Sequence, residues 1–129
     1  MARRATNRPT DGELEILKVL WERGPCTVRE VREALRPHRR VAHTTVLTIL
    51  QIMVDKGLAE ADTSQHAHIY RARQSRPGVG RRLTRDLVER VFDGSAAELV
   101  EHALQGQKAT PEELREIRRV IDEVERRSR

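Results

Sequence analysis

Hydroxyl and amide side chains gather on one side of the segment 41–58, and they are the residues of this sequence best suited to recognition chemistry. The set is Thr44, Thr45, Thr48, Gln51 and Asp55, whose spacing places them on one face of a helix. Threonine hydroxyls and a glutamine amide are short groups that can meet base edges or phosphate oxygens at close range. Since 35% of the residues are charged, an ordinary solvated helix of this chain would carry Glu, Lys and Arg there. The polar face therefore indicates contact with a nucleic acid.

The other side of the same segment is apolar. Val46, Ile49, Leu50 and Met53 fall at i, i+3, i+4 and i+7, which is the spacing of a helix face packed on a core. Gly57 follows in the sequence, and a glycine at this point is typical of a left-handed helix end. The segment is thus predicted to be one helix with a core side and a contact side.

Two shorter helices are expected before it, and each begins with the spacing of a capping box. Thr10 and Glu13 open the first, and Thr27 and Glu30 open the second. Pro37 closes the second helix, so the second and third helices form a helix-turn-helix. The apolar positions are Leu14, Leu17 and Trp21 in the first helix, and Val28, Val31 and Leu35 in the second.

The pattern changes from helical to alternating after the third helix. Residues 58–62 and 68–73 read as two short strands, and the residues between them include turn formers. Three helices followed by a hairpin make a winged helix, whose wing has its tip at 65–67. We therefore predict a mainly α fold with a small β-hairpin, in which residues 10–73 form a winged helix-turn-helix domain.

A second helical region is expected beyond a hinge at 74–80, which contains Pro77 and two glycines. Residues 81–127 show three amphipathic helices, and Thr110 followed by proline and two glutamates is a strong start for the last one. Three short helices cannot bury their apolar stripes well on one another, so we expect a homodimer. The alternative is that they pack back on the winged helix of the same chain. The predicted dimerisation residues are Leu83, Leu87, Val91, Leu99, Val100, Leu104, Leu114, Ile117, Ile121 and Val124.

Composition and charge agree with this division. The 129 residues allow one domain, or one small domain with an appendage, and the aromatic content of 2% requires an aliphatic core. The formal net charge is +5, and residues 1–73 hold thirteen basic and nine acidic residues. The positive excess thus lies with the polar-faced helix, as expected for a domain that approaches a polyanion. A basic surface kept for solubility is the alternative explanation.

The segment 1–9 carries three arginines without apolar periodicity, and we expect a flexible basic arm there. No apolar run approaches the ~20 residues of a membrane span, and no export signal follows Met1. A cytoplasmic protein is therefore expected. Cys26 is the single cysteine, so it forms no internal disulfide, and a half-buried position near a helix start is favoured over a redox role.

Four motifs in this order resemble the BlaI/MecI/CopY family of bacterial winged-helix repressors. They are L-x-x-L-W-x-x-G-P-x-T-V-R-E-V, T-T-V-x-T-x-L-Q-x-M-x-x-K-G, V-F-D-G-S and T-P-E-E-L, and they extend the resemblance over nearly the whole chain. The resemblance implies a homodimer on a near-palindromic operator, with two recognition helices in successive major grooves. Half-sites would then lie roughly 34 to 36 Å apart.

The expected DNA contacts combine the resemblance with the position of the basic residues. Thr44, Thr45, Thr48 and Gln51 match the recognition face of the family. Arg39 and Arg40 precede the helix, where phosphate contacts are common, with a solvated loop as the alternative. The full predicted set is Arg39, Arg40, His43, Thr44, Thr45, Thr48, Gln51, Lys56, His66 and Arg71.

The sequence departs from the family in four places. Ile52 stands on the polar side where a basic residue is usual, and His66 replaces basic residues near the wing tip, which predicts tighter wing binding at acidic pH. His102-Ala103 occupies the place of the Asn-Phe pair that is cut in β-lactam-responsive members, so release by that cleavage is not expected. No cysteine follows Cys26, so the copper chemistry of other members is not expected either.

Enzymatic and metal-binding classes find little support. The sequence has no glycine-rich phosphate loop and no hydrolase nucleophile motif, and His66 and His68 have no supporting ligand at metal-site spacing. We expect no enzyme, no metal and no cofactor. Two other binding classes remain as alternatives, namely a nucleoid-type protein that binds DNA by charge alone and a helical protein-interaction module. The threonine-rich face, which offers hydrogen bonds and little charge, favours a sequence-specific repressor.

Overall fold

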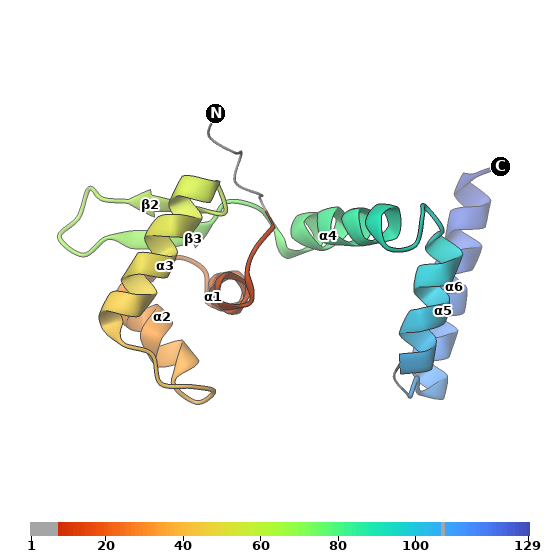
Figure 1. The fold of residues 1–129 in the computed structure, drawn as a ribbon, viewed down its shortest axis with the longest axis horizontal. Coiled ribbons are helices and arrows are strands. Elements are labelled where there is room, and N and C mark those ends of the chain that lie inside the picture. Colours follow the sequence, from red (N-terminus) through yellow and green to blue (C-terminus); the bar gives the residue numbers. More distant parts are fainter. Residues whose placement is uncertain (1–7, 107) are drawn as a thin grey trace. The chain divides into compact units, whose positions relative to one another are not determined.

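The computed structural model describes residues 8–106 and 108–129, and their helices and strands follow the order α1-β1-α2-α3-β2-β3-α4-α5-α6 (Figure 1). The chain divides into two compact units, Met1–Leu83 and Thr84–Arg129. The predicted arm lies mostly outside the described residues. None of the helices in the described part is long and apolar enough to cross a membrane.

The N-terminal unit begins with the expected helices. Both capping boxes are confirmed: the Thr10 hydroxyl accepts from the Glu13 amide, and the Thr27 hydroxyl accepts from the Glu30 amide. The third helix ends at Gly57, whose φ of 81° is a left-handed conformation that favours glycine. The helix bounds are Asp11–Arg23 for α1, Val28–Leu35 for α2 and His43–Lys56 for α3.

The wing belongs to a three-stranded antiparallel sheet rather than to an isolated hairpin. The predicted hairpin is present as β2 and β3, with Ala61 opposite Tyr70. A third strand, β1, pairs with the free edge of β3 and places Cys26 opposite Tyr70. Two residues are too few to show an alternating pattern, so the sequence does not predict β1. The strand bounds are Cys26–Thr27 for β1, Ala59–Asp62 for β2 and Ile69–Ala72 for β3.

The core of this unit fills the space between α1, α2, α3 and the sheet. Val46, Leu50 and Met53 of α3 are completely buried, as their spacing predicts. In α1 the deepest side chains are Ile16 and Leu17 rather than the whole predicted stripe. The predicted Leu14 and Trp21 are only partly buried against this core.

The predicted hinge at 74–80 is wrong, because most of it forms the start of α4, Arg76–Arg90. The Ser75 hydroxyl accepts from the Gly78 amide and caps the new helix. Pro77 lies in the first turn, where a helix needs no amide donor, so the proline begins the helix instead of interrupting it. The boundary between the two units falls inside α4, after Leu83, and not at the predicted limits of 73 and 81.

The first turns of α4 belong to the N-terminal unit. Val79 is 5% exposed, and the Trp21 indole N–H donates to the Gln74 carbonyl oxygen at 2.8 Å just before the helix. These contacts tie the beginning of α4 to α1. The aromatic residue whose sequence position suggested a core role therefore joins two segments 53 positions apart.

The C-terminal unit contains the end of α4 followed by α5, Ala96–Gly106, and α6, Pro111–Arg127. The predicted caps are confirmed, since the Ser95 hydroxyl accepts from the Glu98 amide and the Thr110 hydroxyl accepts from the Glu113 amide. No residue described in this unit is buried. The elements are well formed by their caps, yet the unit has no interior of its own.

Candidate nucleic-acid interface

Six exposed side chains form the outer face of α3, and we call them the recognition face. The side of α3 that holds Val46, Leu50 and Met53 is fixed in the core, so the opposite side must face outward. The polar residues predicted for this face of the helix all lie on it, together with Ile52, which is 44% exposed. The recognition face consists of Thr44, Thr45, Thr48, Gln51, Ile52 and Asp55.

Contacts at both ends hold α3 in place. Before its first turn, the Arg32 guanidinium donates to the Val41 carbonyl oxygen at 2.9 Å. At its last turn, the Lys56 ammonium lies 2.7 Å from a Glu13 carboxylate oxygen. That carboxylate also accepts from the Thr10 amide, so one buried group caps α1 and anchors the end of α3.

Lys56, which was predicted to contact DNA, makes an ion pair within the protein. Its side chain is 14% exposed, and its ammonium is held by the Glu13 carboxylate. On the helix, Lys56 lies beside Ile49, seven residues earlier, at the edge of the core-facing side. The ammonium is needed there because Glu13 is 3% exposed, and a buried carboxylate is costly without a cationic partner.

A pocket of about 500 Å³ lies beside α3, between the start of α2 and the wing. Its floor is apolar and includes Leu47 and the buried Tyr70, while cationic and imidazole side chains surround it. The structure thus gathers groups from three elements that are distant in sequence. The basic groups that line the pocket are Arg29, His43, His66 and His68.

Two members of this set were not predicted as contact residues, namely Arg29 and His68. Arg29 is the second residue of α2 and follows the Thr27 cap, and anions are often bound at such helix starts. That signal was present in the sequence. No sequence pattern shows that the start of α2 faces the wing, because this depends on how the sheet packs.

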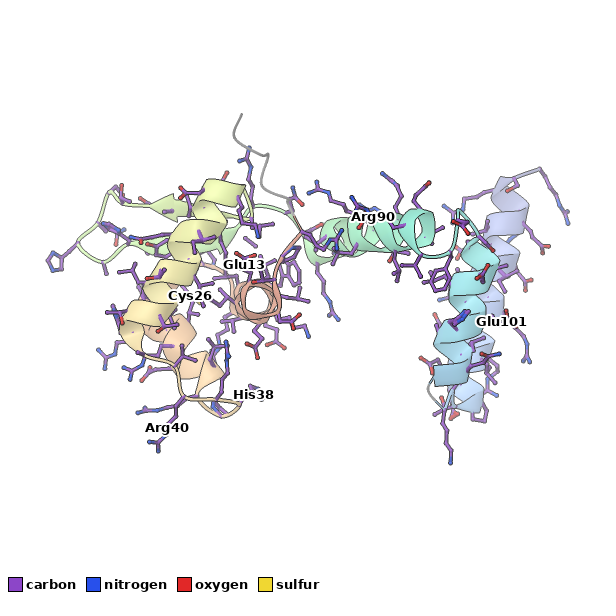
Figure 2. All side chains as sticks on the ribbon, viewed as in Figure 1. Glu13, Cys26, His38, Arg40, Arg90 and Glu101 are labelled. Carbon is purple, nitrogen blue, oxygen red and sulfur yellow. The ribbon has the colours of Figure 1, made fainter. Side chains whose placement is uncertain are left out.

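The other predicted basic residues differ in what they contact. The Arg39 guanidinium lies 3.0 Å from a Glu15 carboxylate oxygen of α1, and the Arg71 guanidinium lies 3.2 Å from Glu60 across the wing. Arg40 extends from the loop between α2 and α3 (Figure 2). Both ion pairs are exposed, so they are weak enough for a phosphate to compete with them.

At the wing, the Asp62 carboxylate accepts from the Ser64 amide at 3.0 Å and from the Ser64 hydroxyl at 2.6 Å. These hydrogen bonds lower the pKa of the Asp62 carboxyl group below its ordinary value. A local turn of this kind fixes the direction in which the chain leaves β2. It precedes the tip that carries His66.

Cys26 is 3% exposed, and its thiol donates to the Gly24 carbonyl oxygen. Burial raises the pKa of the Cys26 thiol, and the nearby Glu30 carboxylate adds to this, while Arg23 acts in the opposite direction. A protonated, buried thiol is a poor nucleophile. In the described residues, no three side chains of His, Cys, Asp or Glu come together as a metal site.

The ten predicted dimerisation residues lie on α4, α5 and α6, except Val91, which directly follows α4, and none of them is buried. Leu83 is the last residue of the N-terminal unit, whereas the other nine belong to the C-terminal unit. Val120 is 48% exposed and was not predicted, because it lies at the edge of the α6 stripe. Large hydrophobic side chains at least 42% exposed in this unit are Leu87, Val91, Val100, Val120, Ile121 and Val124.

Comparisons with known proteins agree with this architecture. The chain is 33% identical over 118 residues to the transcriptional regulator BlaI of Mycobacterium tuberculosis, covering 88% of this chain and 84% of the relative. It is 21% identical over 120 residues to the penicillinase repressor of Bacillus licheniformis, covering 93% and 94% of the two chains. The solved structure of hsRosR-S4 in a complex shares the fold with a TM-score of 0.52 and 17% identity, covering 96% of this chain and all of that one.

A sequence profile described as penicillinase repressor matches residues 9–123, which is most of the chain. The match includes α3, which carries the recognition face, and it continues through α4, α5 and most of α6. The two relatives are covered over more than four fifths of their own length, so the likeness is not confined to the winged helix. The chain belongs to the penicillinase repressor family.

Proposed function

We propose that this protein is a sequence-specific transcriptional repressor that binds, as a homodimer, to a near-palindromic DNA operator. The observation that carries the proposal is the recognition face of α3, which is exposed while the opposite side, with Val46, Leu50 and Met53, is buried in the core. An α-helix fits the major groove of B-DNA, where short polar side chains can distinguish base pairs. Membership of a family whose relatives are named as regulators and repressors supports the same conclusion.

The basic groups beside α3 are placed to contact the phosphates of the DNA backbone. Arg29, His43, His66 and His68 line one pocket next to the recognition face, and Arg40 projects from the loop before it. We assign these groups to phosphate contacts, since such contacts position a helix in the groove while base contacts specify the sequence. Arg39 and Arg71 join them by exchanging an exposed carboxylate partner for a phosphate.

In this proposal the C-terminal unit provides the surface that binds the second copy of the chain. Several large apolar side chains of this unit are about half exposed, and an identical chain offers a self-complementary surface for them. A dimer presents two recognition faces to one operator, which accounts for a near-palindromic target. We place the protein in the cytoplasm, where a bacterial operator lies.

The test is a fluorescence-anisotropy titration against the promoter region of the protein's own gene and a scrambled duplex of equal length, at ~150 mM salt. Specific binding at least ~10³-fold tighter than binding to the scramble is expected. Thr48→Ala should remove most of this difference and leave binding to the scramble unchanged. Thr84→Ala, which alters an exposed threonine on another helix, is the matched control.

Two other outcomes define the alternatives. Equal binding to both duplexes with a steep dependence on salt would indicate a nucleoid-type protein, provided that selection from random duplexes also yields no preferred sequence. Absence of binding to any duplex would indicate a protein-interaction module. In both cases Thr48→Ala and Thr84→Ala would behave alike.

A further inference from the structure

The recognition face has no positive charge. α3 contains two residues that can carry one, and both are turned elsewhere: His43 lines the pocket beside the wing, and Lys56 pairs with the buried Glu13. What remains on the face is three threonines, one glutamine, one isoleucine and Asp55. The charge that attracts DNA therefore surrounds this helix, while the face itself offers hydrogen bonds and methyl groups.

Such a face cannot make the commonest contact with guanine. In the major groove, guanine presents two acceptors that are typically bound by Arg or Lys, and neither residue is on the face. A glutamine amide matches the donor and acceptor of adenine, and threonine methyl groups match the methyl group of thymine. From Thr44 to Ile52, every side chain on the face can contact an A·T pair through a methyl group or the glutamine amide, while the threonine hydroxyls can bond to any base pair. Asp55, near the end of the helix, is the one suited to cytosine.

Ile52 is the unusual member of this face. It is 44% exposed, and it is the only residue of the N-terminal unit among the large hydrophobic residues that stand exposed in the described part of the chain. It lies four residues after Thr48 and eight after Thr44, so the three side chains form one row along α3. An apolar side chain on this row faces the groove, where the thymine 5-methyl is the main apolar group.

We infer that the recognition face selects A·T pairs opposite residues 44–52, and that Ile52 packs against the 5-methyl group of a thymine. The inference rests on the proposed function, and it names the class of sequence that the operator contains. It gives the exposed Ile52 a role that phosphate binding cannot give, since an isoleucine has no group that a phosphate attracts. Contact with the sugar-phosphate backbone is the competing explanation, and it predicts no dependence on base identity.

The experiment first selects preferred duplexes from a random pool with the full-length protein. Each thymine of the selected half-site is then replaced by deoxyuridine, which keeps the base pair and removes only the 5-methyl group. Affinities are measured for the wild-type chain, Ile52→Ala and Ile52→Val. Because Ile52 is exposed and alanine favours helices, Ile52→Ala is expected to fold normally.

At one thymine of each half-site, removing the methyl group should weaken wild-type binding about fourfold, the effect expected for one buried methyl-sized group. Ile52→Ala should bind the thymine and deoxyuridine duplexes equally at that position, and Ile52→Val should show an intermediate ratio. The other thymines should keep the same ratio in all three proteins. Selected half-sites should hold A·T pairs opposite residues 44–52.

The inference is overturned if every thymine gives the same ratio for the wild type and Ile52→Ala while selection still yields one sequence. It is also overturned if the selected pairs opposite residues 44–52 are G·C. Either result leaves the repressor function intact. If selection yields no preferred sequence at all, the proposed function fails, and the inference falls with it.

Discussion

The two units of this chain treat their apolar side chains in opposite ways. In the described part of the N-terminal unit, residues 8–83, fifteen hydrophobic residues are buried, and three of them in α3 are completely enclosed. In Thr84–Arg129, no described residue is buried, although the helices are equally well capped. Capping specifies where a helix begins and ends, but only burial provides the main free energy of folding. The first unit is therefore complete as one chain, and the second is expected to be completed by another copy.

The largest expected effect is on the core of the N-terminal unit. Leu50→Ala should lower the free energy of unfolding of this unit by about 2–5 kcal/mol, because it leaves a cavity at a completely buried position. Urea unfolding followed by the fluorescence of Trp21, the single tryptophan, measures this directly. Ile52→Ala is the matched control two residues away, and its cost should be within about 0.5 kcal/mol. Equal costs at the two positions would contradict the observed orientation of α3.

A charge introduced on the apolar face of the C-terminal unit should weaken dimer formation instead of destabilising the N-terminal unit. Ile121→Asp should raise the dimer dissociation constant by about 100-fold or more, because it places an unpaired carboxylate in the proposed interface. Sedimentation measures the association, and Trp21 fluorescence should report an unchanged N-terminal unit. Arg126→Asp places the same charge on the opposite side of α6 and should leave the dimer intact. A dimer that tolerates Ile121→Asp would show that the second copy uses another surface.

Lys56 and Arg40 separate a positioning role from a DNA contact within the N-terminal unit. Lys56→Met should cost about 1–3 kcal/mol of stability, because it removes the partner of the buried Glu13. It should leave the slope of log affinity against log salt unchanged. Arg40→Met should do the reverse, with little effect on stability and a slope smaller by about one for each phosphate contact removed. A reduced slope for Lys56→Met would restore Lys56 to the interface.

The smallest effect concerns the turn that leads to the wing tip. Ser64→Ala should raise the pKa of the Asp62 carboxyl group toward its ordinary value, since both hydrogen bonds that lower it come from Ser64 and one of them is from the hydroxyl. The contribution of this turn is present above the ordinary pKa of aspartate and is lost as pH falls through the lowered pKa. An NMR titration of the Asp62 carboxyl carbon measures the shift. Ser95→Ala, in the other unit, should leave it unchanged.

Where several of the helices begin can be predicted from short stretches of the sequence. The caps at Thr10, Thr27, Ser95 and Thr110 are all found where their spacing predicts them, because a capping hydroxyl reaches only two or three residues along the chain. The core side of α3 was equally predictable from the helical spacing of Val46, Leu50 and Met53. The opposite side of the same helix must then face outward. The sequence by itself therefore determined which side of α3 is available for recognition.

The tertiary structure decided every feature that depends on segments distant along the chain. It pairs the two-residue strand β1 with β3, joins Trp21 to Gln74, and directs Lys56 to a buried carboxylate on α1. It also brings Arg29 to the same pocket as the wing histidines. The physical reason is that a residue type and its spacing define the groups on offer, whereas packing decides which partner each group meets. The same reason explains the C-terminal unit, whose stripes could be read from the sequence but leave large apolar side chains such as Ile121 half exposed.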